Sequence, residues 1–312
     1  MKKLNSIEYL KTFSILYIVG FWHLSDYTNY LSITKNPFLS DLTLTVLGLF
    51  VFISGFLLGK TNKQPINFLP FLKKRLLRIY PLYALAVIVF YFFDINNALI
   101  SIKSLFFISM FSGPAPFTLW FITMIMFFYV LTPFLVNAVK NKKKYFLFIL
   151  LCSIVTFILI VFYKNIDYRL AFYFPLFCLG IYCSNYGVRD RYVNFNLAMV
   201  LLLFGLLLKQ IEINSWLITQ FFKLPIVLSC SYIIFYFSII NECKFKSLGI
   251  ISIISYSSFS MYLFHRPIYS SLIEFYFPKQ EELQFLYLIF GCFLVLIVSW
   301  GIQKTYDHIC LK

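Results

Sequence analysis

The stretch FLKKRLLRIYP, residues 71–81, places four cations directly before a long apolar run. Cations gather at the cytoplasmic ends of membrane helices, so this stretch sets the direction in which the neighbouring spans run. Arg75 and Arg78 are three residues apart, which on a helix puts both guanidinium groups on one face, where they can grip a phosphate. The plainer alternative, a topology signal alone, suits Lys73 and Lys74 better, because only arginine offers a bidentate fork.

Composition excludes a soluble globular domain. Of the 312 residues, 61% are hydrophobic and 21% aromatic, whereas only 12% are charged, about half the share typical of soluble domains. We therefore expect an all-α, polytopic membrane helix bundle with about ten transmembrane helices, forming a single domain over residues 1–312. The predicted spans lie near residues 9–29, 41–59, 79–94, 117–138, 145–163, 169–185, 195–209, 220–240, 249–274 and 283–304. The run 98–111 is ambiguous, so nine to eleven spans fit the sequence.

The net charge of +15 is interpreted as topology rather than as nucleic-acid binding, because the cations lie in short loops between apolar runs. With the N-terminus in the cytoplasm, most of the 27 Lys and Arg residues fall on the cytoplasmic side, as the positive-inside rule requires. This bias predicts that both termini are cytoplasmic in a multi-pass protein of the cell membrane. The lipid bilayer is then a partner, and nucleic acid is not.

Polar side chains inside the spans are the functional candidates, because the bilayer makes them costly to keep. His23 lies about 21 Å into the first predicted span, and Asp26 follows at i+3, close enough to orient the imidazole of a general base. His265 lies at a similar depth in another span of the same direction, so both histidines are expected to face one cavity. The alternatives are a packing role for His23 and, for His265, satisfaction of backbone carbonyls that Pro267 frees.

Other catalytic motifs are missing from the sequence. Ser54 lies in VFISGF, which lacks the first glycine of GxSxG because Phe52 stands there. Ser54 and Gly55 are instead expected to let two helices approach closely. No Walker A loop, GxGxxG turn or HExxH pair occurs, so we expect no permanently bound cofactor and no metal.

Several longer stretches follow one another along the chain in an order and spacing that carry information together. The first, SIEYLKTFSILYIVGFWH, residues 6–23, places Glu8 and Lys11 before an apolar run that ends in His23. The others are LGLFVFISGFLLG around Ser54, FLKKRLLRIYP with Arg75 and Arg78, APFTLWFI around Trp120, FYFPLFCLG around Pro175, and SYSSFSMYLFHRPI with Tyr262 and His265. In order and spacing, these stretches resemble the acyltransferase-3 family of integral membrane proteins over essentially the whole chain. Glu8 and Lys11 stand where that family usually has aspartate and arginine, and lysine lacks the planar fork.

The resemblance implies transfer of an acyl group from a cytoplasmic acyl-CoA co-substrate, commonly acetyl-CoA, to a hydroxyl of a carbohydrate at the outer face. In that reaction Arg75 and Arg78 would hold the CoA phosphates, and His23, oriented by Asp26, would be the general base. His265 or Tyr262 would bind the acceptor or polarise the thioester carbonyl. The wider group of residues near the acceptor is His265, Tyr262, Glu8, Lys11, Ser54 and Trp120.

Aromatic residues near the outer span ends give a further indication about the acceptor. Trp120, Trp216, Tyr27, Tyr30 and Tyr276 can stack on sugar rings there, although interfacial aromatic belts are the commoner cause of such a pattern.

Two other functions also fit the sequence. A transporter or flippase for polysaccharide or lipid-linked sugar would use the buried histidines to relay protons and the basic stretch to touch lipid headgroups. The chain shows no repeated half, which such transporters often have. A non-catalytic partner of polysaccharide-synthesis proteins would need neither His23 nor Arg78. The function that we expect is O-acetylation of a surface polysaccharide, and binding of acetyl-CoA separates it from the other two.

Overall fold

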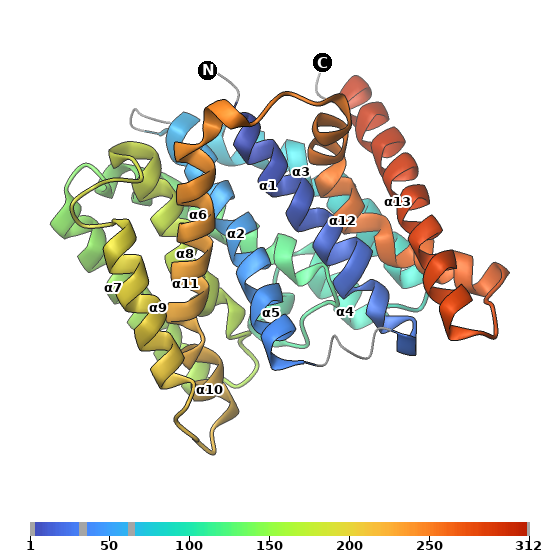
Figure 1. Cartoon of the computed structure of the whole chain (residues 1–312), viewed down its shortest axis with the longest axis horizontal. Coiled ribbons are helices and arrows are strands. Elements are labelled where there is room, and N and C mark those ends of the chain that lie inside the picture. The colour runs from blue at the N-terminus through green and yellow to red at the C-terminus, as the bar shows by residue number, and fades with distance from the viewer. Residues whose placement is uncertain (1–3, 31–35, 62–65, 311–312) are drawn as a thin grey trace.

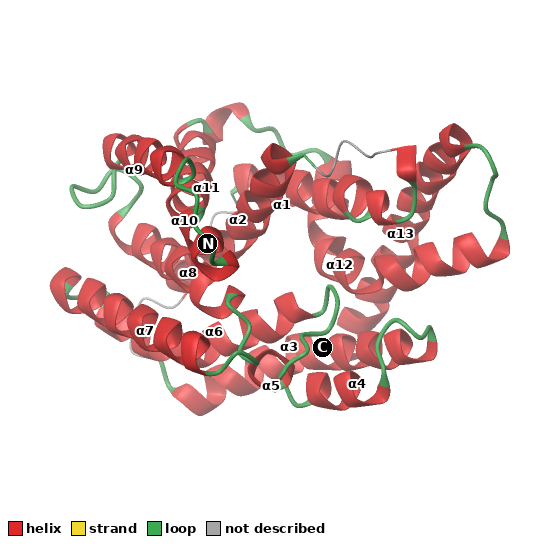
Figure 2. Ribbon diagram, turned by 90° about the horizontal axis from the view of Figure 1, so that it is seen from below, coloured by secondary structure: helices red, strands yellow, loops and turns green. Residues whose placement is uncertain are grey.

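The computed structural model describes residues 4–30, 36–61 and 66–310, and within these ranges every regular element is a helix (Figure 2). The long helices pack side by side, and α1 begins and α13 ends at the same face of the bundle (Figure 1). We call this the terminal face and the opposite end of the bundle the far face. The all-α class expected from the composition is confirmed.

The helices differ widely in length. They are α1 (Asn5–Tyr17), α2 (Pro37–Thr61), α3 (Phe68–Phe92), α4 (Ala98–Leu105), α5 (Ser109–Ser112), α6 (Trp120–Ala138), α7 (Lys142–Phe162), α8 (Arg169–Tyr186), α9 (Phe195–Leu208), α10 (Trp216–Phe222), α11 (Leu224–Ile240), α12 (Gly249–Phe275) and α13 (Glu281–Cys310). Asparagine side chains cap α4, α7 and α9 by accepting a hydrogen bond from the third backbone N–H that follows, which satisfies a donor that the helix itself cannot.

Six segments of the described chain are long and apolar enough to cross a membrane: α2, α3, α6, α7, α10 with α11, and α13. Each coincides with a predicted span. The other four predicted spans are also helical, but α1 and α9 have only 13 and 14 residues, and α8 and α12 carry more polar side chains. The run 98–111 folds into α4 and α5, of 8 and 4 residues, both too short to cross. The protein is therefore a membrane helix bundle, and its ten spans stay a prediction.

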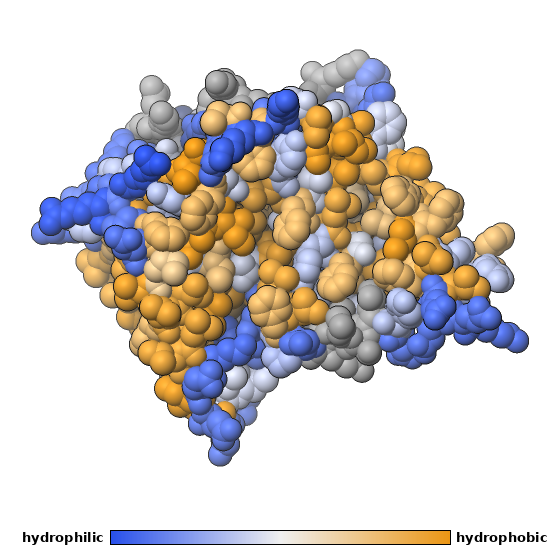
Figure 3. All heavy atoms as spheres, viewed as in Figure 1, coloured by the Kyte–Doolittle hydropathy of each residue, from blue (hydrophilic) through white to orange (hydrophobic). Residues whose placement is uncertain are grey.

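Apolar side chains cover much of the outside of the bundle (Figure 3). On α7 they are the most exposed, since only 11% of the residues in its most apolar 18-residue stretch are buried. Soluble proteins rarely expose apolar patches of this extent, so the surface fits hydrocarbon as its solvent.

The basic stretch lies on a helix rather than in a loop before one. α3 begins at Phe68, and all of residues 71–81 belong to its terminal-face half. The span expected from Ile79 is thus extended by about three turns toward the terminal face. Arg75 and Arg78 project from a rigid element because the helix continues through Pro81.

Two glycines allow α2 and α8 to touch along their backbones. A Cβ at Gly55 would lie 2.1 Å from the carbonyl oxygen of Phe177, and one at Gly180 would lie 2.1 Å from the carbonyl oxygen of Phe52. The expectation that Gly55 lets two helices approach closely is confirmed. Forcing a methyl group into such a contact costs about 1–3 kcal/mol.

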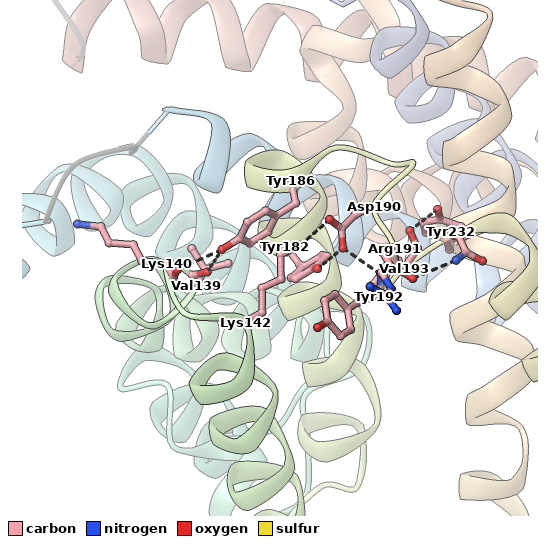
Figure 4. A network of polar contacts seen from close by, with 11 residues as sticks. Val139, Lys140, Lys142, Tyr182, Tyr186, Asp190, Arg191, Tyr192, Val193 and Tyr232 are labelled. Atoms are coloured by element: carbon pink, nitrogen blue, oxygen red, sulfur yellow. Dashed lines mark hydrogen bonds and ion pairs between the residues drawn. The ribbon is translucent and has the colours of Figure 1, made fainter.

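A polar network at the terminal face ties the loop between α8 and α9 to its surroundings (Figure 4). Asp190 accepts hydrogen bonds from Lys142 Nζ (2.6 Å) and from the Tyr182 hydroxyl (2.5 Å). The Lys142 ammonium lies 4.2 Å from the centre of the Tyr186 ring, a cation–π distance. The Tyr232 hydroxyl donates to the backbone of the same loop, so α7, α8 and α11 are joined at one point.

Candidate active site

A local change of helix type places His23. α1 continues into a π-helical turn from Ile18 to Trp22, and the backbone N–H of His23 donates to the carbonyl of Ile18, five residues back, at 2.9 Å. A π turn holds one residue more than an α turn, so it rotates every side chain that follows, and such turns are frequent at functional sites. The first span is therefore not the continuous helix expected from its apolar run.

The two histidines of the sequence analysis lie together. The rings of His23 and His265 are parallel, with an interplanar angle of 4° and a centroid distance of 4.8 Å. His265 is fully buried, and its Nδ1 lies 2.9 Å from the carbonyl oxygen of Tyr262 and 3.2 Å from that of Met261. A carbonyl only accepts, so Nδ1 of His265 carries the proton and Nε2 keeps its lone pair.

The alternative role for His265, satisfaction of carbonyls freed by a proline, does not match these contacts. Pro267 lacks the N–H that would bond the carbonyl of Leu263, whereas His265 contacts the carbonyls of Met261 and Tyr262. His265 Nε2 and His23 Nδ1 are both buried without a hydrogen-bond partner among the described residues. Native proteins rarely leave buried polar atoms unpaired, and those that occur need an explanation such as a bound ligand.

Asp26 differs from the sequence expectation. Its Oδ2 accepts a hydrogen bond from Arg266 Nη2 at 2.7 Å, and no contact to the imidazole of His23 is found among the described residues. The i+3 spacing failed as a guide because the helix does not continue: His23 ends the π turn, and Leu24–Asp26 form a 3-10 turn. The carboxylate therefore faces α12 instead of the ring three residues earlier.

Arg266 is the residue of this site that sequence reasoning missed. It is 8% exposed, its Nε has no hydrogen-bond partner among the described residues, and its guanidinium lies 4.9 Å from the centre of the Phe117 ring. It is close enough to both histidines to act on them electrostatically. The sequence did contain a signal for Arg266: an arginine inside an apolar run is costly to keep in a membrane and therefore indicates a functional residue.

The remaining far-face candidates pack around the histidine pair. The Tyr262 hydroxyl donates to the carbonyl of Thr118 at 2.6 Å, so it is already engaged. Trp120 is 8% exposed, stacks on Tyr173, and lies under the Arg169 guanidinium at 3.9 Å. The structure therefore gives Trp120 packing contacts with Tyr173 and Arg169 and little exposed surface, and its stacking on an acceptor sugar stays a prediction.

A second cluster lies toward the terminal face and is strongly cationic. Arg78 is exposed on α3, while Arg75 is half-buried between the rings of Phe71 and Tyr129. Lys11 on α1 is near enough to Arg78 for their charges to repel. Like charges held together in this way favour binding of an anion that neutralises them.

The other two residues expected near the substrates line this cationic cluster and not the histidine pair. Glu8 accepts a hydrogen bond from the Ser252 hydroxyl at 2.9 Å and balances part of the charge of Lys11. Ser54 lies beside the Tyr129 hydroxyl. The structure thus divides the predicted residues into two groups: one beside Glu8 and Lys11 on α1, and one beside His23, after the π turn that follows α1.

The described chain thus holds a buried imidazole pair and, nearer the terminal face, a cationic cluster. The family model that describes an acyltransferase domain, acyltransferase 3, matches residues 4–304. The chain belongs to the acyltransferase-3 family. The resemblance that the sequence motifs indicated is thereby confirmed. No curated protein and no solved structure has significant similarity to the chain.

The acyltransferase keeps these polar groups in its interior, with His265 Nε2 and His23 Nδ1 buried, although polar groups are costly to keep inside a membrane bundle. The stacked histidines are held by α12 and by the π turn after α1, so their geometry belongs to rigid elements rather than to loops.

Proposed function

We propose that this acyltransferase moves an acetyl group from cytoplasmic acetyl-CoA to a hydroxyl of an extracytoplasmic carbohydrate, in the cell membrane. The observation that carries the proposal is the parallel His23 and His265 pair, whose free nitrogens are buried beside Arg266. Buried lone pairs next to a cation are what transfer to a hydroxyl needs: a base for its proton and a positive charge for the oxyanion.

The donor binds at the cationic cluster of Lys11, Arg75 and Arg78. Arginine forks match phosphate oxygens, and a half-buried guanidinium such as that of Arg75 gains more from this pairing than an exposed one. Lys11 and His23 are twelve residues apart on α1 and its π turn, a rise of about 18 Å. The extended arm of CoA spans this distance, so that the thioester reaches the histidines while the phosphates stay at the terminal face.

At the histidines, the acceptor oxygen attacks the thioester carbonyl. The new C–O bond forms as the C–S bond breaks, and His23 takes the hydroxyl proton and passes it to the departing thiolate of CoA. Arg266, fixed by Asp26, stabilises the negative charge that develops on the carbonyl oxygen. His265 supports the ring of His23 by stacking, and its Nε2 lone pair accepts a hydrogen bond from a neighbouring hydroxyl of the acceptor, not from the hydroxyl that reacts.

Binding of acetyl-CoA and slow hydrolysis of its thioester, measured in nanodiscs, test the proposal. His23→Ala is expected to lower turnover by about 10²–10⁴-fold and to leave binding unchanged. Arg78→Ala is expected to weaken binding by about tenfold or more. The matched controls are His308→Ala and Lys74→Ala, since Lys74 is exposed on the same helix as Arg78.

Full turnover in a well-folded His23→Ala protein would refute the base assignment. Equal loss of binding in Lys74→Ala and Arg78→Ala would show a diffuse charge effect rather than a donor site. Sugar movement across vesicles without CoA would favour the transporter.

A further inference from the structure

A large cavity opens at the far face of the bundle, away from the cationic cluster. It has a volume of about 1050 Å³ and lies between four segments: residues 112–115, the far-face end of α7 with Phe157, Ile160 and Val161, the residues 164–169 that lead into α8, and residues 215–218 at the start of α10. α10 lies at the lower tip of the bundle in Figure 1. Pockets for small ligands occupy about 300–1,000 Å³, so this one has room for a bulky ligand.

A second cavity adjoins the first. It has a volume of about 520 Å³, shares Ser112, Lys164, Asn165 and Ile166 with the first, and is lined by Tyr163 as well. Two adjoining cavities give room for more than one unit of a chain.

Hydrogen bonds hold the walls of the cavity in place. The backbone N–H of Asp167 donates to the carbonyl of Met110 at 2.8 Å, which ties the α7–α8 loop to α5. Lys103 Nζ donates to the carbonyls of Ser112 (3.1 Å) and Gly113 (2.7 Å). The cavity is therefore preformed, and a ligand pays little ordering entropy when it binds.

Trp216 provides an aromatic wall. Its side chain is 64% exposed, and Tyr168 meets it edge-on with a centroid distance of 5.1 Å and an interplanar angle of 82°. Most of the indole surface is therefore still accessible to a ligand. The face of an aromatic ring is electron-rich, and it packs well against the C–H groups on one side of a pyranose ring. Trp216 also lines the cavity together with Asn165 and Asp167, so polar groups that a sugar can use lie beside its ring.

The charge of the cavity selects among sugars. Its charged lining residues are Lys164, Asp167 and Arg169. Asp167 and Arg169 neutralise each other through a hydrogen-bonded ion pair, with Nε of Arg169 2.8 Å from Oδ1. Lys164 is exposed and has no ion-pair partner in the described part of the chain. One uncompensated positive charge remains, and it favours an anionic ligand.

A row of packed side chains leads from the lining of the cavity to the histidine pair. Arg169 covers Trp120, Trp120 contacts Phe121, and Phe121 packs on Tyr262 at 5.4 Å. The ring of Tyr262 in turn lies 6.1 Å from His265. A saccharide in the cavity therefore lies on the same side of the bundle as the base.

We propose that this cavity binds the acceptor, and that the acceptor is an anionic oligosaccharide or polysaccharide. One pyranose ring stacks on Trp216, and a carboxylate or phosphate of the chain pairs with Lys164. The inference rests on the proposed function, because it names the substrate class for the same reaction.

Binding of tetrasaccharides to the protein in zwitterionic nanodiscs tests the proposal without any turnover. The probes are the anionic oligogalacturonate and hyaluronan tetrasaccharides, and the neutral maltotetraose and chitotetraose. Trp216→Ala is expected to weaken binding of an anionic probe by about tenfold or more. Lys164→Gln is expected to weaken it by about fivefold and to leave any neutral probe unaffected. The matched controls are Trp300→Ala on α13 and Lys279→Gln in the α12–α13 loop, both exposed and outside the cavity.

Loss of affinity in the two cavity variants and not in the controls supports the site. Failure of every anionic probe to bind at millimolar concentration would overturn it, and so would binding that is equal in all variants. Acetyl-CoA turnover in the same preparations reports the proposed function separately. If the two cavity variants lose saccharide affinity but the native protein does not turn over acetyl-CoA, the saccharide site stands and the proposed reaction is refuted. If acetyl-CoA is turned over but no anionic saccharide binds, the reaction stands and the saccharide site is refuted.

Discussion

At the scale of single residues, the site depends on pairs that join different helices. His23 stacks on His265, and Asp26 pairs with Arg266, so α12 supplies both partners. The carboxylate pairs with the arginine, and the arginine lies near both imidazoles. This arrangement changes what a substitution of Asp26 is expected to do.

Asp26→Asn is expected to lower the rate of acyl transfer by about tenfold or less, because the side chain is 48% exposed and the amide still accepts a hydrogen bond. Arg266→Gln is expected to cost more, since it removes the cation itself. In the double variant the loss should match that of Arg266→Gln alone, because coupled residues are not additive. Rates of thioester turnover for the four proteins check this.

If Asp26 had an orienting role independent of Arg266, the loss of rate in the double variant would equal the product of the losses in the two single variants. Asp94→Asn, in the exposed turn after α3, is the control for a general effect of removing a far-face carboxylate.

At the scale of elements, the terminal-face network of Figure 4 fixes the loop between α8 and α9. Burial works to raise the pKa of the Asp190 carboxyl, but hydrogen bonds from Lys142, Tyr182 and the backbone of Tyr192 outweigh it and lower the pKa to about 2. An unfolded aspartate titrates near pH ~3.9. Because the folded pKa is the lower one, the folded state gains stability above pH ~4 and loses it as the pH falls toward 2.

We expect the melting temperature of the native protein to fall over that pH window, and Asp190→Asn to remove about 1 kcal/mol of that dependence, since the carboxyl lies near the surface. Above pH 5 the variant should be less stable than the native protein, and near pH 2 the two should converge. Thermal unfolding in detergent between pH 2 and 7 measures this. The control Glu212→Gln, in the exposed α9–α10 loop, should keep the pH dependence of the native protein. A loss of stability in Asp190→Asn that is equal at all pH values would contradict the assignment.

At the scale of the whole molecule, α1 begins and α13 ends at one face (Figure 1), and the cavity that we propose for the acceptor lies at the other. The proposed function requires the terminal face to be cytoplasmic. Exposed side chains mark both faces: Cys243 and Cys310 belong to the terminal face, and Lys279 lies in the loop before α13 at the far face.

In sealed vesicles of right-side-out orientation, a membrane-impermeant maleimide is expected to label Lys279→Cys at once. Cys243 and Cys310 should react only after the vesicles are permeabilised. Labelling of Cys243 from outside in intact vesicles would reverse the orientation, and the donor and acceptor faces would then be exchanged. Double replacement of Cys243 and Cys310 by serine is the background control.

The sequence alone determined the class of the molecule and much of its layout. Six predicted spans are helices long and apolar enough to cross a membrane, because the thickness of the bilayer imposes a length on every apolar run. Gly55 was recognised as a contact glycine, and the ordered motifs were sufficient to recognise the family. All of these depend on the local chemistry of the chain.

Only the tertiary structure decided which side chains meet. The π turn rotates His23 onto His265, Asp26 turns to Arg266, Trp120 is covered by Arg169, and Trp216 lines a cavity with Lys164. Such contacts join residues far apart in the sequence, and membrane helices associate through close packing and polar contacts that no apolar pattern encodes. Spacing predicts neighbours on one regular helix. It could not predict which helix would lie alongside, nor where the helix would change its pitch.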